Sequence, residues 1–171
     1  MKSPINIAYI NIAYMYRQYN KSEISRNAVF IHEMTVPKDA IDGNGHVNNV
    51  SFVQWMQDVA VRHFEGSGCM DAMHRAGCTW VVRSHKIQYM SPAFAGETLH
   101  VRTWIVDFGR ARSMRRYKFL RAADGKLLVR GETDWVFVNA KSGRPTAIPE
   151  EISRAFALTD QDIEDSSKTK F

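Results

Sequence analysis

The loop at residues 42–49 holds the densest group of side chains that could take part in chemistry. Asp42, Asn44 and His46 place a carboxylate, an amide and an imidazole close together in the chain. Gly43 and Gly45 lie between them, and glycine lets the backbone take positive φ and lets a ligand approach closely. This combination predicts a small polar site at which a ligand contacts the backbone.

The same loop leads into a segment with helical periodicity, so the start of a helix belongs to the site. Asn48 or Asn49 is suited to cap that helix, and the N–H groups of its first turn then point outward with the positive end of the helix dipole. Such groups stabilise an oxyanion or a polarised carbonyl. The simpler interpretation is that Asp42, Asn44 and Asn49 only shape a turn and a cap.

One long helix and five strands are predicted to position this loop. The helix shows apolar side chains at i, i+3, i+4 and i+7 spacing, namely Phe52, Trp55, Met56, Val59, Ala60, His63 and Phe64. Runs rich in β-branched and aromatic residues predict strands at 29–36, 79–90, 98–108, 112–122 and 126–139. Asp124-Gly125 indicates a hairpin, so we expect consecutive antiparallel strands. This is an α+β architecture in which the sheet curls around the helix.

Length and composition indicate one globular domain with two tails. The 171 residues are 44% hydrophobic and 24% charged, which excludes a disulfide mini-protein and a disordered chain. We expect residues 1–28 to form an N-terminal extension, helical or frayed, residues 29–158 the folded domain, and residues 159–171 a flexible tail. Neither a signal peptide nor a membrane span is predicted, and the two cysteines favour reduced thiols in a cytoplasmic protein.

The segment Asp42 to Asn49 resembles the active-site loop of the hotdog-fold acyl thioesterases. It satisfies both the Asp-x-x-Gly pattern of the 4-hydroxybenzoyl-CoA thioesterase type and the Asp-x-Asn-x-His-Val-Asn-Asn pattern of the acyl-acyl carrier protein type. Phe52 stands where these families commonly carry an aromatic residue. Residues 96–99 resemble their turn into a long strand, and residues 143–149 resemble their closing segment, so the similarity covers about residues 29–155.

The resemblance implies a fold, an activity and roles for particular residues. It implies a hotdog fold, a homodimer or homotetramer built by joining sheet edges, and hydrolysis of an acyl-CoA or acyl carrier protein thioester without a metal or cofactor. Carried over by position, Asp42 is the catalytic carboxylate, acting as general base or as nucleophile. The backbone N–H near Asn49 polarises the carbonyl, and Asn44 and His46 orient the reacting groups.

Three further residues of the same segment are expected to contact the substrate. Gly45 fits the close approach that both family types need, and Phe52 and Trp55 line the substrate site next to the loop. Two features depart from the family patterns. The strand after the helix offers polar residues but no carboxylate, and Ala40 stands where the 4-hydroxybenzoyl type often has a second Asp. The choice between base and nucleophile therefore stays open.

A basic run on the predicted strand 112–122 is a second candidate site. Its side chains split between the two faces of the strand. One interpretation is a cradle for the phosphates of coenzyme A or a landing surface for an acidic carrier protein, formed by Arg112, Arg115, Arg116 and Lys118. The other is a solvated or edge-protecting surface. The net charge of +5 suits an anionic partner. Nucleic-acid binding is not predicted, because no predicted helix carries a stripe of basic residues.

A metal site is not predicted. His63, Cys69, His74 and Cys78 are of ligand types, but their spacing matches no common zinc pattern. His63 falls on the apolar face of the predicted helix, where a hydrogen-bonded and partly buried imidazole is expected.

Two alternatives to thioester hydrolysis stay open. The same pocket could bind an acyl-CoA without cleaving it. An enoyl-thioester hydratase on the same fold resembles an Asp-x-Asn-Pro-x-His pattern, in which the histidine follows the aspartate by five positions. Here His46 follows Asp42 by four positions and no proline follows Asn44, so the hydratase ranks below the other two.

Overall fold

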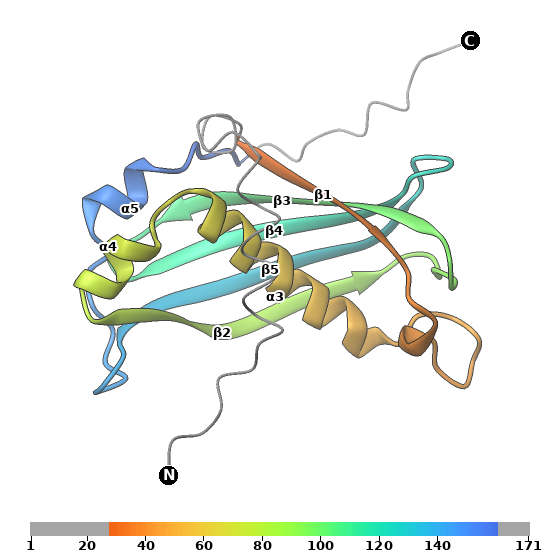
Figure 1. The fold of residues 1–171 in the computed structure, drawn as a ribbon, viewed down its shortest axis with the longest axis horizontal. Helices are drawn as coiled ribbons and strands as arrows, with labels where there is room; N and C mark the ends of the chain where they lie inside the picture. The colour runs from red at the N-terminus through yellow and green to blue at the C-terminus, as the bar shows by residue number, and fades with distance from the viewer. Residues whose placement is uncertain (1–27, 161–171) are drawn as a thin grey trace.

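Five strands form one antiparallel sheet, and a long helix lies across one of its faces (Figure 1). The structure, a computed structural model, describes residues 28–160. Residues 1–27 of the predicted N-terminal extension and residues 161–171 of the predicted C-terminal tail lie outside the described residues. The elements are β1 (Val29–Thr35), η2 (Lys38–Ala40), α3 (Asn49–Gly66), α4 (Met70–Arg75), β2 (Cys78–Tyr89), β3 (Thr98–Phe108), β4 (Arg112–Arg121), β5 (Leu127–Asn139) and α5 (Glu150–Arg154).

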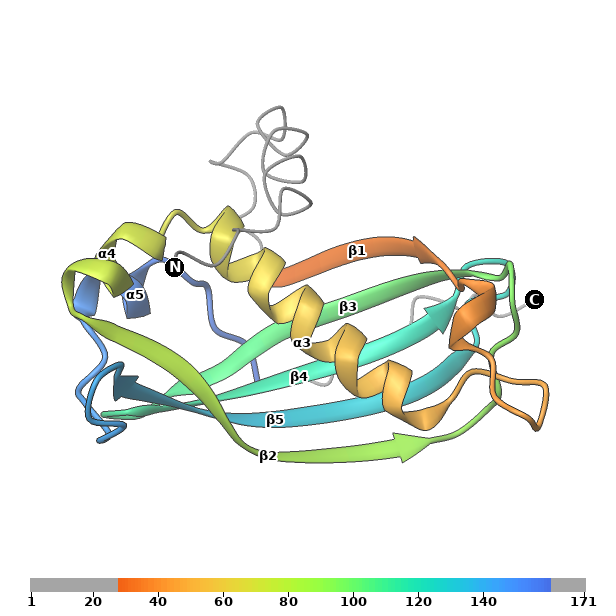
Figure 2. The same cartoon turned by 60° about the horizontal axis from the view of Figure 1, so that its bottom comes forward.

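The sheet has the strand order β1-β3-β4-β5-β2, with β1 and β2 at its two edges on either side of α3 (Figure 2). The hairpin at Asp124-Gly125 is confirmed, because β4 and β5 pair directly. The expectation that all strands pair in chain order is wrong for β2 and β3. The segment between them runs along the end of the sheet, where Ala93 O accepts Val47 N–H and Glu97 O accepts Val36 N–H, so it crosses from one edge to the other.

The helical and strand segments otherwise lie within one or two residues of their predicted bounds. Two short elements had no sequence signal. The helix α5 has five residues and η2 has three, so neither is long enough to show a 3.6-residue apolar period. In both views α5 packs beside α4, at the end of the sheet far from the loop that precedes α3 (Figures 1 and 2).

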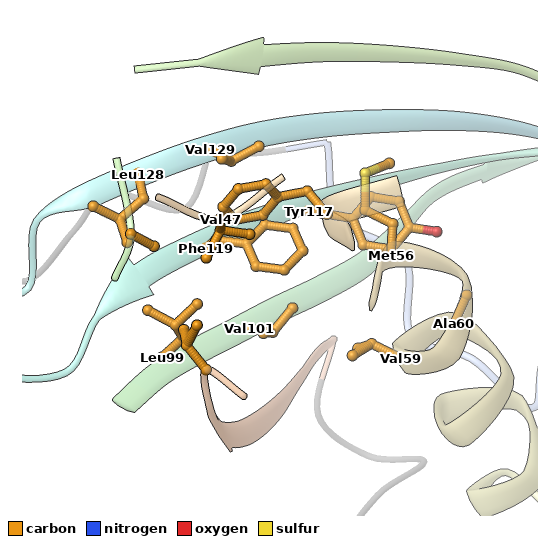
Figure 3. Packing of buried hydrophobic residues seen from close by; sticks show 13 residues of the cluster. Val47, Met56, Val59, Ala60, Leu99, Val101, Tyr117, Phe119, Leu128 and Val129 are labelled. Carbon is orange, nitrogen blue, oxygen red and sulfur yellow. The ribbon is translucent and has the colours of Figure 1, made fainter. Parts of the chain in front are cut away.

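The main core lies between α3 and the sheet. Phe52, Met56, Val59 and Ala60 on the helix are buried, as the periodicity predicts. Figure 3 shows Met56, Val59 and Ala60 facing side chains of β3, β4 and β5, namely Leu99, Val101, Tyr117, Phe119, Leu128 and Val129. Met56 packs against Gly131, where an added Cβ would lie 2.7 Å from the methionine sulfur. The glycine therefore lets the helix approach the middle of the sheet.

His63 is a buried polar residue near the C-terminal end of α3. It is 3% exposed, and its Nδ1 lies 2.9 Å from the Arg115 Nη1 that donates to it. The ring stacks on Phe30 with centroids 5.0 Å apart. Burial, and then the charge of Arg115, lower the pKa of His63 to about 3. The prediction of a hydrogen-bonded imidazole is confirmed, and the burial is deeper than expected.

We expect His63→Gln to reduce the acid sensitivity of folding. The folded pKa of about 3 lies below the ordinary value of 6.5, so between these pH values only the unfolded chain gains the proton. The free energy of unfolding should therefore fall with pH below 6.5, by up to about 1.4 kcal/mol per pH unit from this residue. Urea unfolding of wild type and His63→Gln between pH 4 and 7 measures the difference. Exposed His74 supplies the control, His74→Gln, which should retain the wild-type slope.

Candidate active site

Residues 40–48 form a tight hairpin that ends where α3 begins. Ile41 and Val47 form an antiparallel bridge, Asp42 N–H donates to His46 O at 3.0 Å, and Asn48 N–H donates to Ala40 O at 2.8 Å. Gly45 closes the turn with φ of 80°, a conformation that glycine adopts without strain. These bonds hold the loop against the first turn of the helix.

Asp42 both shapes this turn and keeps an oxygen for other use. Its Oδ1 accepts the backbone N–H of Asn44 at 2.8 Å. His46 Nδ1 lies 3.8 Å from the same oxygen, and the side chains of Asp42 and His46 are 24% and 39% exposed. No hydrogen bond joins Asp42 Oδ2 to any residue that the structure describes. The turn interpretation is thus correct for Oδ1 and leaves Oδ2 available to a ligand or a water molecule.

The start of α3 leaves one N–H group uncapped. Asn48 is the cap, because its Oδ1 accepts Val50 N–H at 3.0 Å and its backbone oxygen accepts Ser51 N–H at 2.9 Å. Asn49 is the first helical residue and is exposed, and within residues 28–160 no acceptor takes its N–H. This is the N–H group that the sequence analysis places at a substrate carbonyl. It points outward at the positive end of the helix.

Tyr89 belongs to this site, although no sequence motif indicated it. Its hydroxyl donates to Asn49 O at 3.1 Å, so the last residue of β2 is tied to the first residue of α3. Desolvation raises the pKa of this phenol, which keeps it protonated as the donor. The available signal was its position at the end of a strand that follows the helix.

Phe52 and Trp55 form the apolar wall behind the loop. Phe52 is 3% exposed and makes edge contacts with Trp55, Tyr89 and Phe119, at centroid distances of 5.3, 5.9 and 5.2 Å. Trp55 is half-buried at the border of the main core. Phe52 therefore positions the first turn of the helix, and Trp55 keeps some surface for a ligand.

The polar residues Ser84 and His85 of β2 lie farther along the sheet than Tyr89. His85 faces inward, with its Nδ1 2.8 Å from Thr133 Oγ1, and burial lowers its pKa. It is four residues from Tyr89, which corresponds to about 13 Å of strand. Ser84 and Gln88 are exposed. Within one chain, His85 is therefore not brought to Asp42, and Gln88, although it is next to Tyr89, lines a groove with Arg116 and Lys118.

The four basic residues predicted on β4 do not form one cradle. Arg112 and Arg116 lie on the outer face, where they pair with Asp134 and with Glu132. Lys118 shares that face and is 3% exposed. Arg115 lies on the inner face beside α3 and is 5% exposed, so the expectation that it belongs to the same surface is wrong. The alternation of a β-strand separates it from the other three.

An apolar cavity of about 200 Å³ lies between the C-terminal half of α3 and the sheet. Aromatic rings dominate its wall, which includes Phe64, Trp80, Phe108, Trp135 and Phe156. Arg115 is the charged residue of this wall. The cavity lies at the end of α3 opposite the Asp42 loop.

The family model described as the thioesterase-like superfamily matches residues 36–156, which include the loop, α3 and all strands except β1. The chain belongs to the thioesterase-like superfamily. This confirms the resemblance on which the roles of the loop residues were based.

Two curated relatives are longer proteins with low sequence identity to this chain. A chloroplastic palmitoyl-acyl carrier protein thioesterase of Cuphea hookeriana is 22% identical over 77% of this chain and 33% of its own length. An L-carnitine dehydrogenase/betainyl-CoA thioesterase of Ruegeria pomeroyi is 27% identical over 71% of this chain and 25% of its own length. The chain of this superfamily member thus spans a quarter to a third of these relatives.

Solved structures confirm the fold. A 1,4-dihydroxy-2-naphthoyl-CoA thioesterase from Synechocystis matches with a TM-score of 0.68 and 21% identity, over 74% of this chain and 94% of that one. The fold of this superfamily member is therefore the hotdog fold, with a curved antiparallel sheet around a central helix. The predicted α+β class is confirmed.

The described part of this superfamily member contains neither a helix that is long and apolar enough to cross a bilayer nor a group of three metal-ligand side chains. Of the residues of ligand type near the end of α3, His63 is engaged with Arg115, and Cys69 and Cys78 are buried free thiols in an apolar cluster.

We expect Asn48→Ala to lower the stability of the fold by about 1 kcal/mol, because it leaves Val50 N–H without its acceptor. Asn48→Asp keeps that acceptor and places a negative charge at the positive end of α3, so its stability should equal or exceed that of wild type. Urea unfolding of the three proteins at pH 7 measures both effects. Equal destabilisation by both substitutions would show that the side-chain cap contributes nothing.

Proposed function

We propose that the protein hydrolyses acyl thioesters, with acyl-CoA or an acyl carrier protein as the thiol carrier. The observation that carries the proposal is that the hairpin with the Asp42 carboxylate leads directly into the first turn of α3, where the N–H of Asn49 has no acceptor among the described residues. Hydrolysis of a thioester needs a group that activates water and a donor for the oxyanion that forms at the carbonyl. Family membership supports this chemistry over others that a carboxylate could serve.

In the proposed reaction, the thioester carbonyl oxygen accepts the Asn49 N–H at the positive end of α3. Asp42 takes a proton from a water molecule, whose oxygen bonds to the carbonyl carbon. The oxyanion of the tetrahedral intermediate is stabilised by the same N–H and by the helix dipole. When the intermediate collapses, the carbon–sulfur bond breaks, the acid is released, and the leaving thiolate takes the proton back from Asp42.

The nucleophilic route uses the same groups. Asp42 would attack the carbonyl carbon and expel the thiolate, and water would then hydrolyse the mixed anhydride. A single turnover in ¹⁸O-labelled water with excess enzyme detects attack of water at the aspartyl carbon of the anhydride, because only that step puts label into the side chain of Asp42. Label in the released acid alone fits both the general-base route and attack of water at the acyl carbon of the anhydride. Trapping with hydroxylamine then separates these two, because an Asp42 anhydride gives an aspartyl hydroxamate and the general-base route gives none.

Neighbouring residues of the loop are proposed to place the reactants. Gly45 has no side chain, so an acyl group can approach the turn at a position where no Cβ stands in its path. His46 lies beside the Asp42 carboxylate and can orient it or the attacking water. Asn44 fixes Asp42 Oδ1 through its backbone N–H, and its exposed side chain is available to the substrate.

The outer face of the sheet supports an anionic carrier as the partner. Arg116 and Lys118 line a groove of about 340 Å³ that also includes Lys86, Gln88, Arg130 and Glu132. Four of these six side chains are basic. We propose that Arg112, Arg116 and Lys118 attract the phosphates of coenzyme A or the acidic face of a carrier protein. Arg115 is not part of this surface.

A homodimer joined through β2 is part of the proposal. In the described residues β2 is an edge strand with no partner on its outer side, and it carries the exposed apolar residues Val81 and Tyr89, which are 42% and 44% exposed. An unprotected edge of this kind favours strand pairing with another chain. Antiparallel pairing of two β2 strands would also set the two α3 helices side by side in opposite directions.

We expect Asp42→Asn to lower kcat for thioester hydrolysis about 10²- to 10⁴-fold, because an amide neither accepts the proton nor attacks the carbonyl. Thiol release from short, long and aromatic acyl-CoAs, with the two cysteines of the protein subtracted, measures the effect. Asp39→Asn is the matched control, because Asp39 is exposed three positions earlier on η2 and should be dispensable. Equal turnover by Asp42→Asn and wild type would remove Asp42 from the mechanism.

The same assay separates the alternatives. Saturable acyl-CoA binding without thiol release, for acyl-CoA and acyl carrier protein substrates alike, would indicate a binding module. Addition of water to an enoyl thioester with the carbon–sulfur bond intact would indicate a hydratase.

A further inference from the structure

Arg115 is a buried cation in the wall of the apolar cavity beside α3. It is 5% exposed, and it lies among the aromatic residues Phe64, Trp80 and Phe156. Its Nη1 donates to His63 Nδ1 at 2.9 Å and to Thr103 Oγ1 at 3.1 Å. Such surroundings are unfavourable for a guanidinium, because burying a charge without a charged partner costs free energy.

The charge of Arg115 has no counter-ion in the described part of the chain. No carboxylate of residues 28–160 lies within 4.0 Å of it, whereas Arg112 and Arg116 on the same strand both have one. His63 does not supply a negative charge, because it is a neutral imidazole that accepts a single hydrogen bond. Thr103 is likewise a neutral acceptor.

Arg115 also has donors left over. A guanidinium carries five N–H groups in a planar fork that matches a carboxylate. Nη1 donates to both acceptors, His63 and Thr103, and neither Nε nor Nη2 donates to a residue that the structure describes. The fork therefore has the positive charge and the free donors that a ligand carboxylate would satisfy.

We propose that this cavity receives the far end of the acyl group, and that Arg115 selects acyl groups whose far end carries a carboxylate. The preferred substrates are then thioesters of dicarboxylic acids. The inference rests on the proposed thioester hydrolysis and adds the chemical class of the acyl group. The ligand carboxylate supplies the missing counter-ion, while the aromatic wall surrounds the carbon chain.

The proposed β2 dimer shortens the path from the carbonyl site to Arg115. Within one chain, Asn49 and His63 are fourteen residues apart on α3, which is about 21 Å. The first turn of α3 lies at the Tyr89 end of β2, and the cavity lies at the Trp80 end. Antiparallel pairing of two β2 strands brings the Tyr89 end of one copy beside the Trp80 end of the other. The acyl chain then enters the cavity of the second copy.

Matched pairs of acyl-CoAs test the proposal in the full-length protein. Glutaryl-CoA and pentanoyl-CoA, suberyl-CoA and octanoyl-CoA, and sebacoyl-CoA and decanoyl-CoA each share a chain length and differ in the terminal group. In wild type we expect kcat/KM to favour the carboxyl-ended member of at least one pair. Betainyl-CoA, whose acyl group ends in a quaternary ammonium, should be hydrolysed least because Arg115 repels it.

Substitution of Arg115 gives the second arm of the test. Arg115→Met keeps the length of the side chain and removes its charge, so the carboxyl preference should fall by about 30-fold or more, the loss expected when one partner of a buried charged pair is removed. Arg154→Met is the matched control, because it removes an exposed arginine that pairs with Glu150, and it should keep the preference.

A binding measurement that needs neither turnover nor substitution of Arg115 completes the design. Octanoate ends in a charged carboxylate and 1-octanol in a neutral hydroxyl. Calorimetry on wild type and Asp42→Asn should show tighter binding of octanoate.

If methyl-ended thioesters are hydrolysed better at every length, or if the carboxyl preference survives Arg115→Met, the inference fails while thioester hydrolysis stands. If no thioester is cleaved but octanoate binds through Arg115, the proposed function fails and the anion site remains. Equal binding of octanoate and 1-octanol by wild type contradicts the inference even if Arg115→Met does not fold.

Discussion

The burial of one face of α3 against the sheet is the constraint on which the rest of the structure depends. Phe52, Met56, Val59 and Ala60 fix how the helix lies on the strands, and Gly131 lets it come close. Since the apolar face begins in the first turn, the helix must start at the edge of the core. Its first N–H then remains outside the core, next to the hairpin that carries Asp42. The packing of the core thus places the two groups that the proposed chemistry needs.

The same packing buries polar groups at the other end of the helix. There α3 presents His63, the sheet presents Arg115 and Thr103, and the surrounding side chains are mostly apolar. Burial away from water lowers the pKa of His63 and also lowers the pKa of Arg115 from its ordinary value, so both groups have their charged forms disfavoured by the same cause. A polar group that a fold keeps in such a place without a charged partner is well suited to recognise a ligand. The two ends of one helix therefore have different proposed roles, one for the reacting carbonyl and one for the far end of the acyl group.

Local patterns were sufficient for most elements and for part of the site. The apolar spacing from Phe52 to Phe64 predicts α3, and Asp124-Gly125 predicts the β4–β5 hairpin. The cap at Asn48 was one of two predicted positions, since capping depends on a few neighbouring backbone groups. The pairing of β2 with β5 and β1 with β3 was not predictable in this way, because it depends on the path of residues 90–97 around the end of the sheet.

The sequence by itself determined the carboxylate-bearing loop, the helix that follows it and the family to which they belong, because these depend on residues adjacent in the chain. Only the tertiary structure decided which face of the sheet each β4 side chain lies on. Arg115 therefore lies on the opposite face from the basic surface that contains Arg112 and Arg116. Alternation along β4 sets Arg115 on the same side as Tyr117 and Phe119, but which side faces the helix follows from the register of the whole sheet. The contact of Tyr89 with Asn49 has the same origin, since forty residues separate them in the chain.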